Sequence, residues 1–225
     1  MRIALCQIPV SSTPGINLGR VRDALREAAD GGADLAVFPE ATLTRFGSDL
    51  RAAAEPLDGP FCAGLAEAAK ETGVALVAGV FEPAPDGRVY NTAVVVDRDG
   101  TLVASYRKLH LFDAFAQRES DLVAPGNSVV VAALAGVSVG VEICYDIRFP
   151  ELTRALAVAG GYWLPLPAMI AAAAASAMPD GPSTSGNPWP RLTELVATAR
   201  ADITPKMEFP RPSRRRLSSG RVTAQ

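Results

Sequence analysis

Apolar positions along the first 160 residues fall into short blocks with two different spacings. Residues 18–29 and 61–71 carry apolar side chains three and four positions apart, and each block ends near glycine, which predicts two amphipathic helices. Pro150 stands at the first turn of a third expected helix, which runs to about residue 159. Seven blocks rich in Val, Leu, Ile and Ala predict strands, at residues 3–10, 35–38, 74–81, 89–96, 101–107, 128–134 and 137–143.

The order of these blocks predicts the fold class. Strands and helices alternate up to residue 81, strands then come in pairs, and a helix follows the last pair. The first of these pairs is joined by residues 97–100 (DRDG), which are a strong signal for a hairpin turn. Amphipathic helices next to strands bury their apolar faces against a sheet. The sequence therefore predicts a mixed α/β fold with helices packed on sheets, and it contains no internal repeat.

The composition narrows the class of protein. With 225 residues, of which 48% are hydrophobic, the chain can form one large domain or a domain with an appendage. A net charge of −2 gives no reason to expect nucleic acid or an anionic membrane as a partner. The N-terminus reads as a strand and not as a signal peptide, and the longest apolar run, residues 164–178, is too short to span a bilayer. Three widely separated cysteines suit a reducing compartment, so we expect a cytoplasmic protein.

Three reactive side chains follow the second, fifth and seventh predicted strands: Glu40, Lys108 and Cys144. Side chains at the strand ends of an α/β sheet reach a common crevice, while the backbone there stays rigid. The Cys144 thiol is a nucleophile, Glu40 is a candidate base, and Lys108 is a candidate for stabilising an oxyanion. The backbone N–H of Tyr145 is expected to assist Lys108. This set of residues predicts acyl transfer through a thioester.

Other interpretations of these residues remain open. Taken singly, each has a structural explanation: a core cysteine, a turn carboxylate and a solvated lysine. The alternative nucleophilic pair is Cys144 with His110, the single histidine, which lies two residues beyond Lys108. A metal site has no support, because three scattered cysteines and one histidine lack the spacing of zinc ligands. No glycine-rich nucleotide-binding motif is present.

Four short motifs occur in order: residues 38–40 (FPE), 90–93 (YNTA), 106–113 (YRKLHLFD) and 143–152 (ICYDIRFPEL). Each alone is a weak signal, whereas their order and spacing together are specific. They resemble the motifs of the nitrilase superfamily of carbon–nitrogen hydrolases.

The resemblance implies an α-β-β-α sandwich and a Glu–Lys–Cys triad at Glu40, Lys108 and Cys144. It also implies a second glutamate near the active site, which Glu119 matches. Members of this superfamily commonly dimerise so that the sandwich extends across the interface, and we therefore expect a homodimer. We expect no metal and no organic cofactor.

The resemblance also implies the class of substrate, a small-molecule amide. The forms KLHLFD and CYDIRFPEL are most similar to the branch that hydrolyses amides of small acids, such as the ω-amides of dicarboxylates. Arg148 is a candidate for binding a substrate carboxylate through a bidentate fork. The alternative for Arg148 is a structural salt bridge to Asp146 or Glu151.

The resemblance fades beyond residue 168, where the composition changes. Residues 1–168 carry 14 Lys and Arg against 20 Asp and Glu, whereas residues 169–225 carry 8 against 4, with seven prolines. We expect residues 1–168 to be the N-terminal majority of a hydrolase domain, so that the sandwich is incomplete at its C-terminal end. Residues 169–225 are expected to be a divergent, partly disordered tail, produced by a truncation or a shifted reading frame or else by a genuine insertion. The alternative function is a catalytically inactive fragment, because an active site without one wall would admit water.

Overall fold

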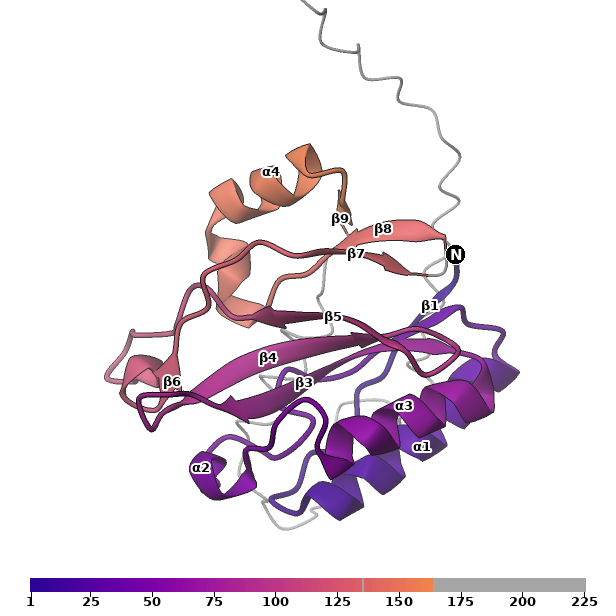
Figure 1. The fold of residues 1–225 in the computed structure, drawn as a ribbon, viewed down its shortest axis with the longest axis horizontal. Coiled ribbons are helices and arrows are strands. Elements are labelled where there is room, and N and C mark those ends of the chain that lie inside the picture. The colour runs from indigo at the N-terminus through magenta and orange to yellow at the C-terminus, as the bar shows by residue number, and fades with distance from the viewer. Residues whose placement is uncertain (135, 164–225) are drawn as a thin grey trace, which may run out of the picture.

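The computed structural model describes residues 1–134 and 136–163, and the tail expected at residues 169–225 lies outside the described residues (Figure 1). The regular elements alternate between strands and helices in the first half, as the sequence predicts. In chain order they are β1 (Ile3–Leu5), α1 (Pro14–Asp30), β2 (Leu35–Val37), α2 (Leu50–Ala53), α3 (Pro60–Thr72), β3 (Ala75–Pro83), β4 (Val89–Val96), β5 (Leu102–Arg107), η1 (Glu119–Asp121), β6 (Val123–Ala124), β7 (Val131–Leu134), β8 (Val137–Gly140), η2 (Cys144–Arg148), α4 (Pro150–Val158) and β9 (Tyr162–Trp163).

The larger sheet has the strand order β1-β2-β3-β4-β5, and β6 pairs with the start of β4. Strands β1, β2 and β3 are parallel, and α1 and α3 lie in the two crossovers that parallel neighbours require. Strands β3, β4 and β5 continue the sheet in antiparallel fashion. The predicted turn at residues 97–100 joins β4 to β5, and its Gly100 has a φ of 85°, which glycine adopts without strain.

A smaller sheet, with the order β7-β8-β9, packs on the other face of the larger one. Helices α1 and α3 cover the outer face of the larger sheet, and α4 lies outside the smaller sheet (Figure 1). The alternation of side chains along β4 separates two apolar cores: Val94 and Val96 pack towards α1 and α3, whereas Ala93 and Val95 pack between the sheets. The four layers confirm the expected α-β-β-α sandwich.

Three strands are clearly shorter than their sequence patterns predict. β1 ends at Leu5, although the apolar pattern runs to residue 10. β7 begins at Val131, although the pattern begins at residue 128, and β8 ends at Gly140, although the pattern runs to residue 143. After β8, the Ile143 N–H donates to the carboxylate of Asp146 at 3.0 Å, and it forms no ladder bond with any of the described residues. The described part of β8 therefore ends before Cys144. Elements α2 and β6 were not predicted, because two to four residues carry no readable period.

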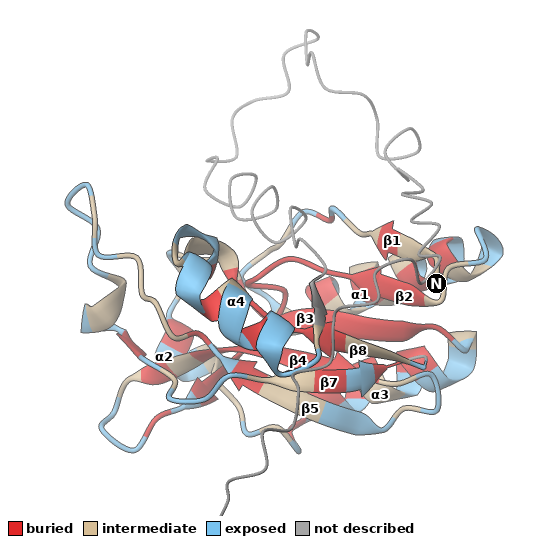
Figure 2. Ribbon diagram, turned by 90° about the horizontal axis from the view of Figure 1, so that it is seen from above, coloured by how far each residue is buried: buried red, intermediate tan, exposed pale blue. Residues whose placement is uncertain are grey.

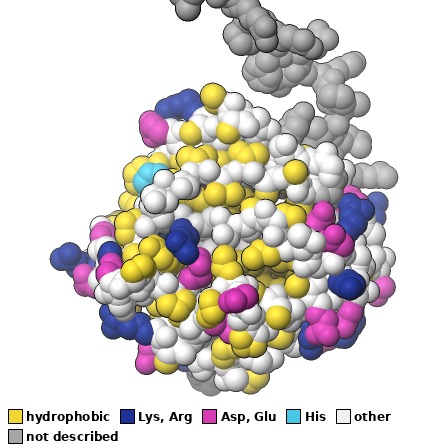
Figure 3. Space-filling model, viewed as in Figure 1, with side chains coloured by type: hydrophobic (Ala, Val, Ile, Leu, Met, Phe, Trp, Pro, Cys, Tyr) yellow, Lys and Arg dark blue, Asp and Glu magenta, His cyan; other side chains and the backbone are white. Residues whose placement is uncertain are grey.

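Burial follows the layers. The central strands β2, β3 and β4 of the larger sheet are mostly buried, whereas β5 is largely exposed or half-buried and α4 exposes its outward side (Figure 2). On the face seen in Figure 3, positive and negative side chains are interspersed. Among the described residues, no helix combines the length and the apolar character needed to cross a membrane.

Candidate active site

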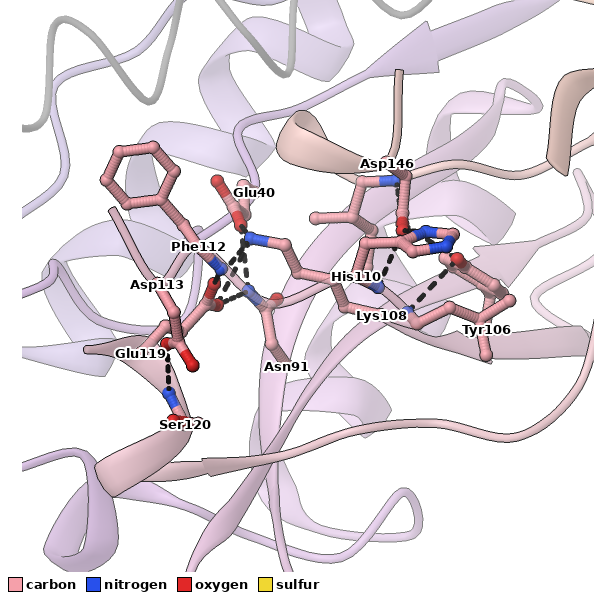
Figure 4. Close-up of polar contacts among 12 residues, drawn as sticks. Glu40, Asn91, Tyr106, Lys108, His110, Phe112, Asp113, Glu119, Ser120 and Asp146 are labelled. Atoms are coloured by element: carbon pink, nitrogen blue, oxygen red, sulfur yellow. Dashed lines mark hydrogen bonds and ion pairs between the residues drawn. The ribbon is translucent and has the colours of Figure 1, made fainter. Parts of the chain in front are cut away.

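The segments that follow β2 and β5 bring Glu40 and Lys108 into contact, and Asn91 of β4 lies beside them (Figure 4). Lys108 Nζ is 2.9 Å from Glu40 Oε1, and both side chains are only 2% exposed. Asn91 Nδ2 donates to the same oxygen at 2.8 Å. Two donors therefore converge on one carboxylate oxygen that is closed to solvent.

Glu119, from η1, completes this cluster. Its carboxylate lies 2.9 and 3.1 Å from Lys108 Nζ, and it accepts a 3.1 Å hydrogen bond from Asn91. The Phe112 N–H also donates to it at 2.6 Å. The sequence predicted Glu119 as a supporting residue, and the structure places it against Lys108. The ammonium therefore sits between two carboxylates.

Strand register explains why Lys108 and Asn91 meet. Thr92 pairs with Arg107 across β4 and β5, and the next pair outward is bonded from the Lys108 N–H to the Asn91 carbonyl at 2.9 Å. Successive side chains on a strand point to opposite faces. Lys108 and Asn91 therefore share the face that looks towards Glu40.

Glu40 reaches the site because its backbone passes close over β3. A Cβ built on Gly79 would lie 1.4 Å from the Glu40 carbonyl oxygen, so no larger residue fits there. Because Gly79 has no side chain, the two segments come close enough for the Gly79 N–H to donate to the carbonyl of Pro39 at 3.1 Å. A glycine inside a strand often marks such a close approach of another backbone segment.

Cys144 begins η2 with a φ of 48° and is half-buried. A non-glycine residue with positive φ is uncommon and is often found at functional sites. Burial raises the pKa of its thiol to about 12, the Glu40 carboxylate raises it as well, and the Lys108 ammonium opposes both. The resting thiol is therefore neutral, and Glu40 influences it more than Glu119, the other carboxylate near enough to raise its pKa.

Lys108 remains charged in this environment. Burial acts to lower the pKa of its ammonium, but the attraction of Glu40 and Glu119 outweighs burial and holds that pKa above its usual range. A positive charge beside the thiol is the feature needed to stabilise a negative oxygen that forms there.

A second buried network ties the Cys144 turn to the segment after β5. Asp146 Oδ2 accepts from Tyr106 Oη at 2.7 Å, and Asp146 Oδ1 accepts from the His110 N–H at 2.9 Å (Figure 4). The His110 ring Nδ1 lies 2.8 Å from the same Oδ1, and the ring stacks on Phe149 with centroids 3.7 Å apart. The carboxylate of Asp146 thus joins two segments that both carry site residues.

The other two predicted residues, Tyr145 and Arg148, lie in η2 with Cys144. The Tyr145 ring packs edge-on against Phe112 and Phe149, and its N–H is in the first turn of η2, where backbone donors lack helical acceptors. Arg148 is exposed, and within the described part of the chain it forms no ion pair with Asp146 or with Glu151. The expected structural salt bridge is therefore not seen.

Sequence reasoning did not single out Asn91 or Asp146 as site residues. Both lie inside motifs that were recognised, residues 90–93 and 143–152. Their side chains acquire roles only through contacts across long stretches of sequence. The alternative pairing of Cys144 with His110 is not what the structure forms, because the His110 ring binds Asp146. In residues 1–134 and 136–163, no group of three or more His, Cys, Asp and Glu side chains is arranged to hold a metal ion.

The raised pKa of the Cys144 thiol predicts an unusual pH profile. Because burial disfavours the thiolate, its reaction with a small reagent lacking an amide group, such as methyl methanethiosulfonate, should be roughly 100- to 1,000-fold slower at pH 8 than in denaturant. The native rate should still be rising at pH 10, whereas the denatured rate levels off above about pH 9. Mass spectrometry of the Cys144 peptide measures both rates. A native midpoint near that of a free thiol would contradict the buried, neutral state.

Known proteins are similar to this chain in sequence. The model of the carbon–nitrogen hydrolase family matches residues 2–201. Hydrolase Rv0480c of Mycobacterium tuberculosis is 49% identical over 163 residues, which cover 71% of this chain and 58% of that protein. Omega-amidase NIT2 of Danio rerio is 38% identical over 165 residues, covering 71% and 60%. The chain thus spans less than two thirds of the length of these relatives.

Solved structures share the fold. Nit3 of Saccharomyces cerevisiae, a member of the nitrilase superfamily, superposes with a TM-score of 0.63 at 28% identity, covering 72% of this chain and 62% of that one. The amidase of Nesterenkonia sp. AN1 superposes with a TM-score of 0.61 at 28% identity, covering 72% and 64%. In that amidase, a mutant carries acrylamide added to the active-site cysteine. With a family model that matches most of its length and a shared sandwich fold, the chain belongs to the carbon–nitrogen hydrolases of the nitrilase superfamily.

Proposed function

We propose that this protein is a cysteine-dependent amidase that releases ammonia from a small amide through a thioester. The observation that carries the proposal is the buried cluster in which Lys108 contacts Glu40 and Glu119, beside the half-buried Cys144. A nucleophile, a base and a fixed cation are the groups that acyl transfer requires.

In the first half-reaction, Cys144 Sγ attacks the amide carbonyl carbon while its proton passes to Glu40. This transfer fits a thiol that is neutral at rest and a carboxylate that lies beside it. The electron pair of the carbonyl moves to oxygen, where Lys108 Nζ and the Tyr145 N–H stabilise the negative charge. When the C–N bond breaks, Glu40 returns the proton to the leaving nitrogen, and ammonia departs from a thioester on Cys144.

In the second half-reaction, water attacks the thioester carbonyl carbon. Glu40 takes a proton from the water, the C–S bond breaks, and the proton passes to the Cys144 sulfur. The free acid then leaves. Glu119 has no proton to move in this scheme, and it acts by holding Lys108 Nζ together with Glu40. Asn91 Nδ2 donates to both carboxylates and so bridges them.

The substrate class we propose is an ω-amide of a dicarboxylic acid. The support is the similarity to the omega-amidases together with Arg148, an exposed cation four residues from Cys144 that could bind the distal carboxylate. Release of ammonia should be measured from the monoamide of a dicarboxylate, from a simple amide of equal length without the carboxylate, and from the matching nitrile.

We expect the monoamide to be hydrolysed fastest and the nitrile slowest. Heat-inactivated protein provides the blank. Equal rates for the monoamide and the simple amide would refute the assignment of the substrate, and no rate above the blank for any amide would refute the proposed activity.

The same proposal includes a cytoplasmic location, a homodimer and a division into two regions. The location is supported by the three cysteines, which form no disulfide, as expected in a reducing compartment. A homodimer remains a prediction. The division into a hydrolase domain at residues 1–168 and a tail at residues 169–225 also remains a prediction. The alternative of an inactive fragment has no support from the comparisons, since the family model matches residues on both sides of residue 168.

A further inference from the structure

We propose that Glu82, Arg107 and Thr92 are positioning residues that act from the opposite face of the larger sheet to hold Lys108 and Asn91 in place. The inference rests on the proposed function, because it concerns the cation of that site. In the part of the chain that the structure describes, none of these three side chains forms a hydrogen bond or an ion pair with Glu40, Cys144 or Glu119. We refer to these three side chains as the back-face cluster.

The contacts of the back-face cluster are short and directional. The Arg107 guanidinium donates to both carboxylate oxygens of Glu82, from Nε at 3.0 Å and from Nη2 at 2.8 Å. Thr92 Oγ1 donates to Glu82 Oε1 at 2.6 Å. The guanidinium carbon also lies 4.0 Å from the centre of the Tyr90 ring. One carboxylate on β3 is thus bonded to a neighbour on β4 and to a neighbour on β5.

The cluster and the site use consecutive residues. Thr92 follows Asn91 on β4, and Arg107 precedes Lys108 at the end of β5. Since neighbouring side chains on a strand point to opposite faces, fixing Thr92 and Arg107 on one face fixes the backbone from which Asn91 and Lys108 project on the other. The β4 and β5 register that pairs Thr92 with Arg107 makes this coupling direct.

The end of β5 needs such an anchor. Its last ladder residue is Arg107, and Lys108 is held beyond it by two backbone bonds, one to Asn91 and one from Gly126. A twist of the strand end would displace Lys108 Nζ, which lies at the far end of a long side chain. A displacement of about 1 Å at a catalytic group can cost roughly 100-fold in rate.

The chemistry of the cluster favours arginine at residue 107. The Glu82 side chain is 7% exposed and that of Arg107 is 43% exposed, so the guanidinium covers the carboxylate. Lysine would preserve the charge but not the planar fork that bonds both oxygens. Methionine would leave a buried carboxylate without its cation, which is destabilising by itself.

The test separates positioning from simple stabilisation. The variants are R107M, R107K and the double variant R107M with Glu82→Gln, in which no unpaired buried charge remains. The matched control is Arg22→Met, which removes a partly exposed arginine bonded to Glu67 at 2.6 Å between the outer helices. Each is assayed well below its melting temperature for kcat, for KM and for the rate of Cys144 alkylation by iodoacetamide.

We expect R107M to lower kcat about tenfold or more with KM changed less than about twofold, and R107K to recover only part of the loss. Alkylation of Cys144 should slow in parallel, because the displaced ammonium no longer favours the thiolate. The double variant should regain melting temperature but not kcat. Arg22→Met should leave kcat and alkylation unchanged.

Recovery of kcat together with melting temperature in the double variant would overturn the inference, since Arg107 would then act through stability alone. Unchanged kcat and alkylation in R107M would also overturn it. If the unmodified protein hydrolyses no amide, the proposed function fails, and the alkylation rates still decide the role of Arg107.

Discussion

Replacing Cys144 with alanine is expected to lower amide hydrolysis by at least about 10,000-fold, because no other group near Glu40 can form the thioester. His110 cannot substitute, since its ring is bonded to Asp146 and stacked on Phe149. The side chain is half-buried and small, so the fold should survive the change. Ammonia release under saturating substrate and the melting temperature are the two measurements.

The matched control is Cys62→Ala. Cys62 is buried in α3, in the core between the outer helices and the larger sheet, away from the site. This variant should lose some stability but keep its kcat. If the Cys144 variant retained a substantial rate, or if the Cys62 variant lost as much, the thioester mechanism would be wrong.

Replacing Lys108 with methionine should have the second largest effect, on both rate and stability. Methionine fills a similar volume but leaves the carboxylates of Glu40 and Glu119 buried without their cation. Removing one partner of a buried pair typically costs about 3–5 kcal/mol. The rate should fall by roughly 100- to 1,000-fold or more, because the developing oxyanion loses its fixed charge. Denaturant unfolding and kcat measure the two losses separately.

Lys70→Met is the control for this prediction, because Lys70 is exposed on α3 and has no ion pair in the described structure. This variant should change neither kcat nor the free energy of unfolding noticeably. A Lys108 variant that unfolds like the unmodified protein would show that the two carboxylates do not depend on the ammonium. A variant that is destabilised but keeps its kcat would remove Lys108 from the oxyanion role.

Much of the fold could be predicted because its signals are local. The helical spacing at residues 18–29 and 61–71 and the apolar runs of β2, β3 and β4 need only a few neighbouring residues to be read. Where prediction erred, at the end of β8, the cause is a polar contact that the spacing of apolar residues does not reveal. The Ile143 N–H donates to the side chain of Asp146, three residues further on, although Ile143 itself is apolar.

For the site, the sequence by itself determined which residue types stand at the strand ends: Glu40, Lys108 and Cys144, in motifs whose spacing is specific to one superfamily. Only the tertiary structure decided how they meet. The contact of Lys108 with Glu40 spans 68 residues, and that of Asp146 with His110 spans 36. Such contacts depend on how the two sheets and the strand register bring distant segments together, and no local pattern encodes that packing.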